Sequence, residues 1–214
     1  MSDEPEDFAD AWYEEKSAIM QQVLGPEHNM VMHSVIPYAV GGGLDLFYYP
    51  NGMIPGTAIA TKELSELPGE GSKNSVFSCY ELVMFTRQEL SLDNVGNKET
   101  PFGKVHSSIN GILNVIAPYS VEATLNPGET CEFPADMEKL GGKCLIFDAY
   151  GKAQKVENAC GMGPAKVPFG LLAVIEIFPE EMEYAREAGG GHLLEKLKAA
   201  GHYPYSDLDR EAVV

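Results

Sequence analysis

The stretch EAGGGHLLEKLKAAG, residues 187–201, has three consecutive glycines before a helical pattern, which is how a phosphate-binding loop can look. Such a loop follows a strand, so that the N–H groups of the turn and of the next helix converge on the anion. The preceding residues, 179–188, instead have Pro179 at a helix start and carboxylates in the first turn. Gly189, Gly190 and Gly191 therefore predict a corner between two short helices, and an anion site is the alternative.

The histidines and carboxylates show no spacing typical of a metal or catalytic site. His28 and His33 are five positions apart, which places them on different faces of a strand or of a helix. The chain has no zinc-type cysteine pair and no G-x-S-x-G motif, so we expect no metal ion, no cofactor and no nucleophilic catalysis. Asp45 and Glu81 lie inside apolar runs. Strand alternation predicts that both face solvent, and general acid–base chemistry in a cleft is the alternative.

The charge of the chain restricts the kinds of partner. Fifteen basic and 32 acidic residues give a net charge of -17, the wrong sign for binding nucleic acid or an anionic membrane. Seven of the carboxylates fall in residues 1–15, which contain no basic residue. Solubility is the simple explanation of this acidity, and an acidic face that attracts a basic protein is the alternative.

The chain shows no sign of export or membrane insertion. It has no basic N-terminal segment followed by an apolar run, and no apolar stretch of 18 residues. We therefore expect a cytoplasmic protein in which the four cysteines, Cys79, Cys131, Cys144 and Cys160, stay reduced. Cys79 lies mid-strand in an apolar run, so we predict that it belongs to the core.

Apolar periodicity predicts a mixture of helices and strands. An amphipathic helix over residues 5–24 is expected to belong to the same domain as residues 26–214. Strands are predicted within 30–38, 44–50, 57–62, 75–87, 142–151 and 168–179, and further helices over 105–117, ended by Pro118, and on each side of the glycines at 189–191. The strand at 168–179 is nearly continuously apolar and should be central. This order predicts an α+β or mixed α/β sandwich, with a mixed sheet packed against helices.

Three blocks of the sequence resemble the suppressor of fused family. The first runs from Val167 to Glu211 and has Pro-Phe-Gly, then Gly-x-x-Leu-Leu-x-x-Leu, then Asp-x-x-Arg. Its matching residues are Pro168, Phe169, Gly170, Gly190, Leu193, Leu194, Leu197, Asp207 and Arg210. The second block is IATKELSELPGE, in which Glu66 replaces the aspartate of a Leu-Ser-Asp-Leu motif. The third is YELVMFTR, which keeps Glu81 and Leu82 and has Tyr80 where the family has phenylalanine.

The resemblance implies an α/β sandwich that binds a protein and has no known catalytic activity. Animal members of the family restrain a transcription factor in Hedgehog signalling, and they close over its peptide with a second, C-terminal domain. Bacterial members look like immunity proteins that neutralise toxins of rival cells. Because the sequence ends at Val214, just after the first domain, we expect the stand-alone bacterial type.

We therefore predict a module that sequesters or neutralises a protein partner. If the acidic residues of the chain serve binding, this partner is basic. The candidate binding surfaces are the loop at 63–75, the acidic helix at 179–188 and exposed strand edges. Their predicted contact residues are Glu63, Glu66, Pro68, Glu70, Glu180, Glu181 and Glu183. The alternative is a hydrolase-like enzyme with a dispersed site of carboxylates and a histidine. A deep pocket with convergent carboxylates or a His–carboxylate pair would favour the enzyme, and a shallow surface would favour binding.

Overall fold

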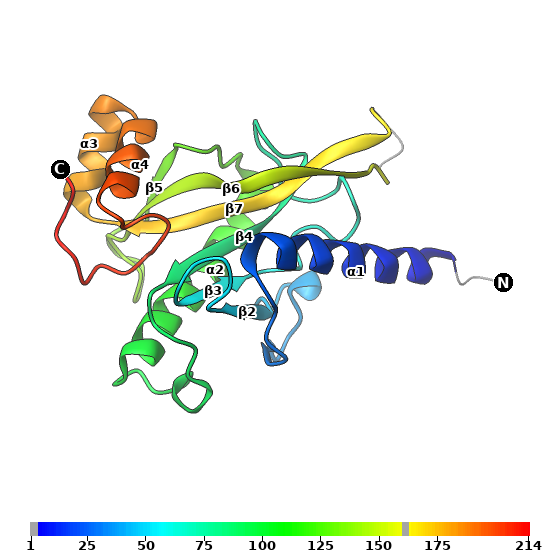
Figure 1. Ribbon diagram of the computed structural model, residues 1–214, viewed down its shortest axis with the longest axis horizontal. Helices are drawn as coiled ribbons and strands as arrows, with labels where there is room; N and C mark the ends of the chain where they lie inside the picture. Colours follow the sequence, from blue (N-terminus) through cyan, green and yellow to red (C-terminus); the bar gives the residue numbers. More distant parts are fainter. Residues whose placement is uncertain (1–3, 160–162) are drawn as a thin grey trace.

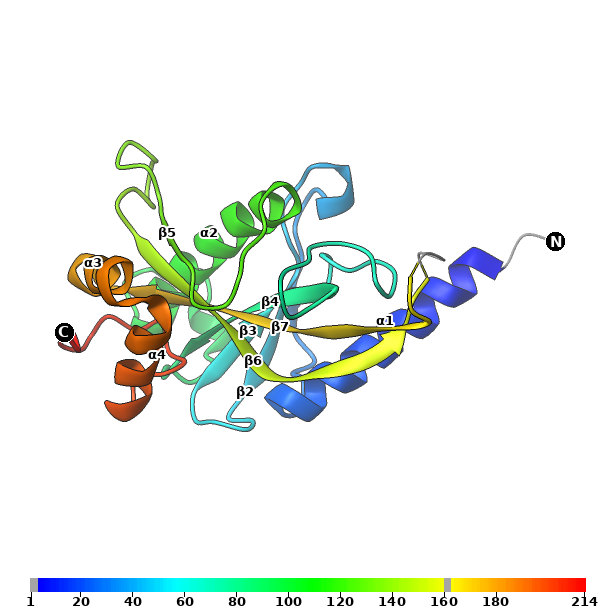
Figure 2. The same cartoon turned by 90° about the horizontal axis from the view of Figure 1, so that it is seen from above.

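In the part of the chain that the structure describes, seven strands form one mixed sheet, which has helices on both of its faces (Figures 1 and 2). The computed structural model describes residues 4–159 and 163–214. The strand order is β1-β2-β3-β4-β7-β6-β5, and neighbouring strands are antiparallel except for the parallel pair β4 and β7. The predicted α+β class, with a mixed sheet packed against helices, is confirmed.

The elements have the following bounds. The strands are β1 (Val31–Met32), β2 (Leu46–Pro50), β3 (Thr57–Ala60), β4 (Cys79–Thr86), β5 (Thr130–Glu132), β6 (Cys144–Glu157) and β7 (Lys166–Ile177). The helices are α1 (Glu4–Leu24), α2 (Pro101–Glu122), α3 (Pro179–Ala188) and α4 (Gly190–Ala199), and short 3₁₀ helices cover Tyr38–Val40 and Leu92–Asn94. In the described part of the chain, no helix is both long and apolar enough to cross a membrane.

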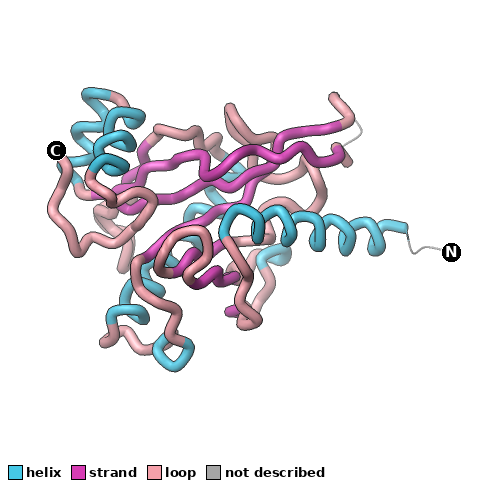
Figure 3. Tube along the Cα trace, in the orientation of Figure 1, coloured by secondary structure: helices cyan, strands magenta, loops and turns pink. Residues whose placement is uncertain are grey.

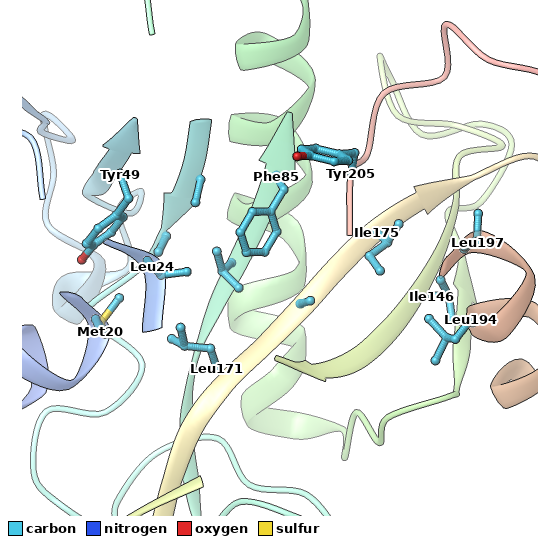
Figure 4. Close-up of a cluster of buried hydrophobic side chains, with 14 of the residues drawn as sticks. Met20, Leu24, Tyr49, Phe85, Ile146, Leu171, Ile175, Leu194, Leu197 and Tyr205 are labelled. Carbon is cyan, nitrogen blue, oxygen red and sulfur yellow. The ribbon is translucent and has the colours of Figure 1, made fainter. Parts of the chain in front are cut away.

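Each face of the sheet has its own hydrophobic core. On β7, Ala173 and Ile175 pack with α1, α3 and α4, whereas Leu172 and Val174 pack with α2 on the other face. Figure 4 shows side chains of α1 and α4 gathered over the sheet within the first of these cores. The strands run through the middle of the molecule, with α3 and α4 at one end and the start of α1 at the other (Figure 3). The result is a layer of helices on each face of one sheet.

β7 is the central strand that its composition predicts. It lies between β4 and β6, and every residue from Leu171 to Ile177 is buried. A strand covered on both faces loses the alternation of apolar and polar residues, which explains its nearly continuous apolar sequence. β4 is covered in the same way, and all eight of its residues are buried.

α2 is longer than predicted at both ends. Thr100 caps its start by accepting a hydrogen bond from the Gly103 N–H at 3.2 Å, and Pro101 occupies the first turn. The prediction that Pro118 ends the helix is wrong, since the helix continues to Glu122. A proline removes one backbone hydrogen bond, but buried residues on both sides of it, Ala117 and Ser120, keep the helix packed on the sheet.

The strand predicted within residues 30–38 is reduced to the two residues of β1. From His33 onward the chain forms a loop that contains the 3₁₀ helix Tyr38–Val40. Asp45 holds this loop, because its Oδ1 accepts the Ser34 N–H at 2.9 Å and its Oδ2 contacts His33 Nδ1 at 2.6 Å. The short edge strand β5 was not predicted, because three half-exposed or exposed residues carry no periodic signal.

The three glycines at 189–191 form the predicted corner between α3 and α4. Gly189 has φ +98°, a backbone conformation that residues with a Cβ rarely adopt. Gly190 is required for a different reason: a Cβ there would lie 1.9 Å from the carbonyl oxygen of Gly128. Gly191, by contrast, has no heavy atom within 4 Å of the position of a Cβ. Gly189 is therefore needed for its backbone conformation, and Gly190 for the close contact with Gly128.

We expect Gly190→Ala to lower the free energy of unfolding by about 1–3 kcal/mol, because the added methyl overpacks the contact with Gly128. Gly191→Ala is the matched control. It adds a methyl in open space inside α4, so it should raise stability by about 0.5–1 kcal/mol. Urea unfolding of both variants checks this, and equal changes in the two would contradict the steric explanation.

Candidate functional site

A pocket of about 480 Å³ lies between α1, the β1–β2 edge of the sheet and the loop that follows β3. We call it the acidic pocket. It is lined by Ala9, Asp10, Trp12, Tyr13, Lys16, Val31, His33, Ala39, Asp45, Phe47, Lys62, Glu63 and Glu66. Two of the predicted contact residues, Glu63 and Glu66, are thus brought together with two further carboxylates from other parts of the chain.

Hydrogen bonds to the backbone fix two of the four carboxylates in the acidic pocket. Glu63 Oε2 accepts the Asp45 N–H at 2.6 Å, and Asp45 in turn accepts the Ser34 N–H. Asp10 and Glu66 are exposed and, among the described residues, have no ion pair. The pocket therefore combines two positioned carboxylates with two that are free to move.

Glu63 has a raised pKa. Its partial burial is the largest cause, and the negative charges of Asp45 and Glu81 raise the pKa further. The hydrogen bond from Asp45 N–H and the positive charge of Lys16 lower it by less. A nearby positive charge would stabilise the ionised form of such a carboxylate. The electrostatics of the pocket therefore favour a cation.

The two lysines of the acidic pocket already have partners beneath it. Lys62 Nζ lies 2.6 Å from Glu27 Oε2, donates to Ser17 Oγ at 2.8 Å and sits 4.4 Å from the centre of the Phe47 ring. Its side chain is buried, and this burial lowers its pKa despite the contact with Glu27. Lys16 is paired with Glu81. The charges left without partners in the pocket are therefore negative.

Glu81 is the carboxylate that anchors this region. It is fully buried and contacts Lys16 Nζ at 3.1 Å, and it also accepts the Thr61 hydroxyl at 2.7 Å and the N–H groups of Leu64 and Ser65. The prediction that Glu81 faces solvent is wrong. Strand alternation fails here because both faces of β4 are covered.

α1 is tied to the same loop. Lys16 Nζ donates to the carbonyl oxygens of Lys62 at 2.5 Å and Ser65 at 2.6 Å, and Trp12 Nε1 donates to the Ser65 carbonyl at 2.9 Å. These bonds fix α1, which forms one wall of the acidic pocket, against the residues that carry Glu63 and Glu66. The pocket is therefore built around a buried ionic network.

The three sequence blocks that resemble the family lie close together in the structure. Two of them take part in this network, and the third packs beside it. Glu81 of YELVMFTR binds the backbone of Leu64 and Ser65 in the LSEL segment. Gly170 of the Pro-Phe-Gly block lets the Phe77 ring approach, since a Cβ there would lie 2.1 Å from that ring. Asp207 accepts the Thr86 hydroxyl at 2.5 Å and the Arg87 N–H at 2.7 Å. These residues hold the fold together.

An exposed apolar loop lies beside the acidic pocket. The loop between β1 and β2 supplies His33 and Ala39 to the pocket lining, and it also carries Val35, Ile36 and Val40. The exposed fractions of these three residues are 100 %, 57 % and 73 %. Scattered exposed apolar residues are ordinary, but three within six residues, next to a charged pocket, are typical of an interaction surface.

Two of the predicted contact residues are not available to a partner. Pro68 is buried, and so is Glu181. The carboxylate of Glu181 binds both Nη atoms of Arg210, at 2.6 and 2.8 Å, and also accepts the N–H groups of Phe178 and Val213. Burial raises its pKa, but these hydrogen bonds and the charge of Arg210 lower it by more, so the net shift is downward. Glu181 thus joins the start of α3 to the C-terminal segment.

The remaining predicted residues are exposed but lie apart. Glu70 is exposed in the loop after β3, and Glu180 and Glu183 are exposed on α3, where Glu183 pairs with Arg186. α3 lies at the opposite end of the molecule from the first turns of α1 (Figures 1 and 2). The predicted loop and the predicted helix are therefore separate surfaces, and only the loop contributes residues, Glu63 and Glu66, to the acidic pocket.

Two features that could indicate an enzyme, a pair of carboxylates in one pocket and a His–carboxylate pair, are present. A pocket of about 610 Å³ contains the buried carboxylates Glu176 and Asp207, but Glu176 binds Lys143 and Ser108, and Asp207 binds the end of β4. The acidic pocket has a His33–Asp45 pair, whose imidazole is 72 % exposed, and among the described residues its lining includes no serine, threonine or cysteine. Within residues 4–159 and 163–214, no group of three potential metal ligands is found.

The cysteines of the described segments are thiols. Cys79 and Cys144 are buried and Cys131 is partly buried, and burial raises the pKa of all three. The prediction of Cys79 as a core residue is confirmed. Cys160 lies outside the described residues.

Comparison with known proteins finds a family and several solved structures that are similar to this chain. The family model of the suppressor of fused protein (SUFU) matches residues 43–211, and no curated protein matches the chain. Of the solved structures, the Sufu–Fu complex has a TM-score of 0.59 and 15 % identity, over 96 % of this chain and 92 % of that one. Drosophila Suppressor of Fused has a TM-score of 0.58 and 16 % identity, over 92 % of this chain and 50 % of that one. A SUFU homolog from Neisseria gonorrhoeae has a TM-score of 0.55 and 14 % identity, over 95 % and 98 %.

We expect Glu81→Gln to lower the free energy of unfolding by about 3–5 kcal/mol, because it leaves the Lys16 ammonium buried without a counter-charge. Glu66→Gln removes the same charge at an exposed position and should change stability by no more than about 0.5 kcal/mol. Chemical denaturation of both variants measures the difference. An unfolding free energy unchanged by Glu81→Gln would show that the network does not stabilise the fold.

Proposed function

Because the chain belongs to the suppressor of fused family, we propose that it is a protein-binding module that receives a basic segment of its partner in the acidic pocket. The observation that carries the proposal is the set of four carboxylates, Asp10, Asp45, Glu63 and Glu66, around one pocket whose lysines are already paired. A protein cation would supply the charge that the pocket lacks.

The lining of the acidic pocket suits an arginine or lysine side chain. The carboxylates can accept several hydrogen bonds from a guanidinium or ammonium group, and charge-assisted bonds of this kind are stronger than neutral ones. Lys62 Nζ already lies 4.8 Å from the centre of the Tyr13 ring, and the exposed part of this ring offers a surface for the apolar stem of such a side chain. Arginine fits best, since its planar group can bind a carboxylate with two bonds.

The loop that carries Val35, Ile36 and Val40 supplies the apolar part of the proposed interface. Interfaces combine an apolar centre with a charged rim, and burial of these exposed side chains would contribute the hydrophobic part of the affinity. The partner segment therefore has a basic residue close to apolar ones.

The biological role that follows is sequestration or neutralisation of the partner. The net charge of -17 would accelerate association with a basic protein and penalise binding of acidic ones. A toxin that acts on nucleic acid is basic for the same electrostatic reason, so an immunity-type protein is the specific form of the proposal.

We expect affinity capture from the source lysate to retain one stoichiometric basic partner at low salt and to lose it at high salt, because salt screens exposed charges. Asp10→Lys/Glu66→Lys should abolish this capture. Glu180→Lys/Glu183→Lys, with the same change of net charge on α3, should retain it. The opposite pattern would move the binding surface to α3, and capture insensitive to salt and to both variants would refute the electrostatic mechanism.

We also expect the affinity for a short arginine-containing peptide to fall as the pH is lowered, starting above the range in which an ordinary glutamate titrates. The pKa of Glu63 is raised, and a bound cation favours its ionised form, so binding releases protons and strengthens as Glu63 ionises. Titration calorimetry at several pH values measures this, with Glu63→Gln as the variant that loses this part of the pH dependence. Equal pH profiles for the two proteins would exclude Glu63 from the interface.

A further inference from the structure

A groove of about 500 Å³ between α2 and the turn that precedes β6 has the opposite charge to the rest of the protein. Its lining contains four lysines, Lys98, Lys104, Lys139 and Lys143, and one carboxylate, Glu138. Acidic residues outnumber basic ones by 32 to 15 in this chain, so four of the 15 basic residues at one groove are a local reversal of charge. We call this site the lysine groove.

The charges of the lysine groove are only partly neutralised. Lys143 is paired with Glu176, and Lys139 lies 3.5 Å from Glu138 with both side chains largely exposed, a kind of pair that contributes little. Lys98 and Lys104 are exposed and have no ion pair within the described part of the chain, although carboxylates are abundant. The groove therefore keeps a net positive charge.

The position of Lys104 at the start of α2 is itself unfavourable without an anion. Lys104 lies in the first turn of this 22-residue helix and Lys98 lies just before it, whereas no acidic residue occupies that turn. The start of a helix carries the positive end of its dipole, where cations are destabilising and anions are stabilising. A bound oxyanion would relieve the repulsion among the lysines and between them and the helix.

The backbone holds the groove in shape. Lys139 has φ +68° in the turn after β5, a conformation that sets the direction of its side chain. α2 approaches the same turn closely, since a Cβ at Gly111 would lie 3.3 Å from Leu140 Cδ2. Ser107 adds a hydroxyl group to the lining, whereas the Ser108 hydroxyl donates to Glu176 Oε2 at 3.2 Å. The walls of the groove are thus set by two packed elements.

We propose that the lysine groove binds an oxyanion, a carboxylate or a phosphate, carried by a segment of a protein. Lysine ammonium groups and the Ser107 hydroxyl together suit such an oxyanion. The neighbouring pocket shares Lys104, Ser108 and Lys143 but is also lined by Glu99, Glu176, Asp207 and Asp209, so the positive charge is confined to a short length of surface. An extended polyanion such as nucleic acid would be repelled by the net charge of -17. α2 lies on the opposite face of the sheet from α1, so the groove is distinct from the acidic pocket.

Fluorescence anisotropy with labelled peptides tests the proposal on the full chain. The probes are a phosphoserine peptide, its glutamate-rich counterpart and the unmodified serine peptide, with inorganic phosphate as competitor and a duplex DNA for comparison. The variant Lys98→Glu/Lys104→Glu is compared with Lys152→Glu/Lys155→Glu, which makes the same charge change at exposed lysines of β6 outside the groove. Lys139→Glu is a second groove variant in case the first does not fold.

We expect saturable binding of at least one anionic peptide, weakened about tenfold or more by the groove variants and less than about twofold by the β6 control, where tenfold corresponds to about 1.4 kcal/mol. Preference for the phosphoserine or for the glutamate peptide, together with competition by inorganic phosphate, identifies the oxyanion. No saturable binding of either peptide, equal losses in the groove and control variants, or tighter binding of the DNA would overturn the proposal. None of these outcomes depends on the acidic pocket.

Discussion

The buried pair of Lys16 and Glu81 is the interaction on which the organisation of this protein depends. A buried charge is costly unless its hydrogen bonds are complete, and Glu81 meets this requirement only when α1, the end of β3 and the LSEL segment are all in place. The network therefore couples three elements that are distant in the sequence. The acidic pocket is formed by the outer surfaces of the same elements, so its shape follows from the buried charges beneath it.

The basic residues of the chain fall into a buried group and an exposed group. Lys16, Lys62 and Arg210 are buried with a carboxylate partner each, and they hold α1, the loop after β3 and the C-terminal segment to the rest of the fold. Because each of these cations has a carboxylate partner, the three pairs are neutral and leave the net charge of -17 on the rest of the chain. The lysine groove on the opposite face is the exception. The acidic pocket and the lysine groove thus lie on opposite sides of one sheet.

Most of the fold could be predicted from the sequence, and each prediction that was wrong has a physical reason. Helices with one apolar face, such as α1, and the continuous apolar strand β7 were recognised because their periodicity reflects burial directly. Pro118 did not end α2 because tertiary packing outweighed one lost hydrogen bond. Glu81 was misplaced because alternation assumes one solvent face, and β4 has none. Glu181 was taken for a surface residue because its partner, Arg210, lies 29 positions away, with α4 between them.

The sequence by itself determined the class of fold, the family and the acidic character of the protein, because these depend on composition, on local periodicity and on motifs read along the chain. It also indicated the loop that carries Glu63 and Glu66. Only the tertiary structure decided which charges are free. Asp10, Asp45, Glu63 and Glu66 become one site, and Lys98, Lys104, Lys139 and Lys143 another, through contacts between distant elements. Whether a charge is buried and paired or exposed and available depends on its neighbours in space, and those neighbours are set by packing across the whole sheet.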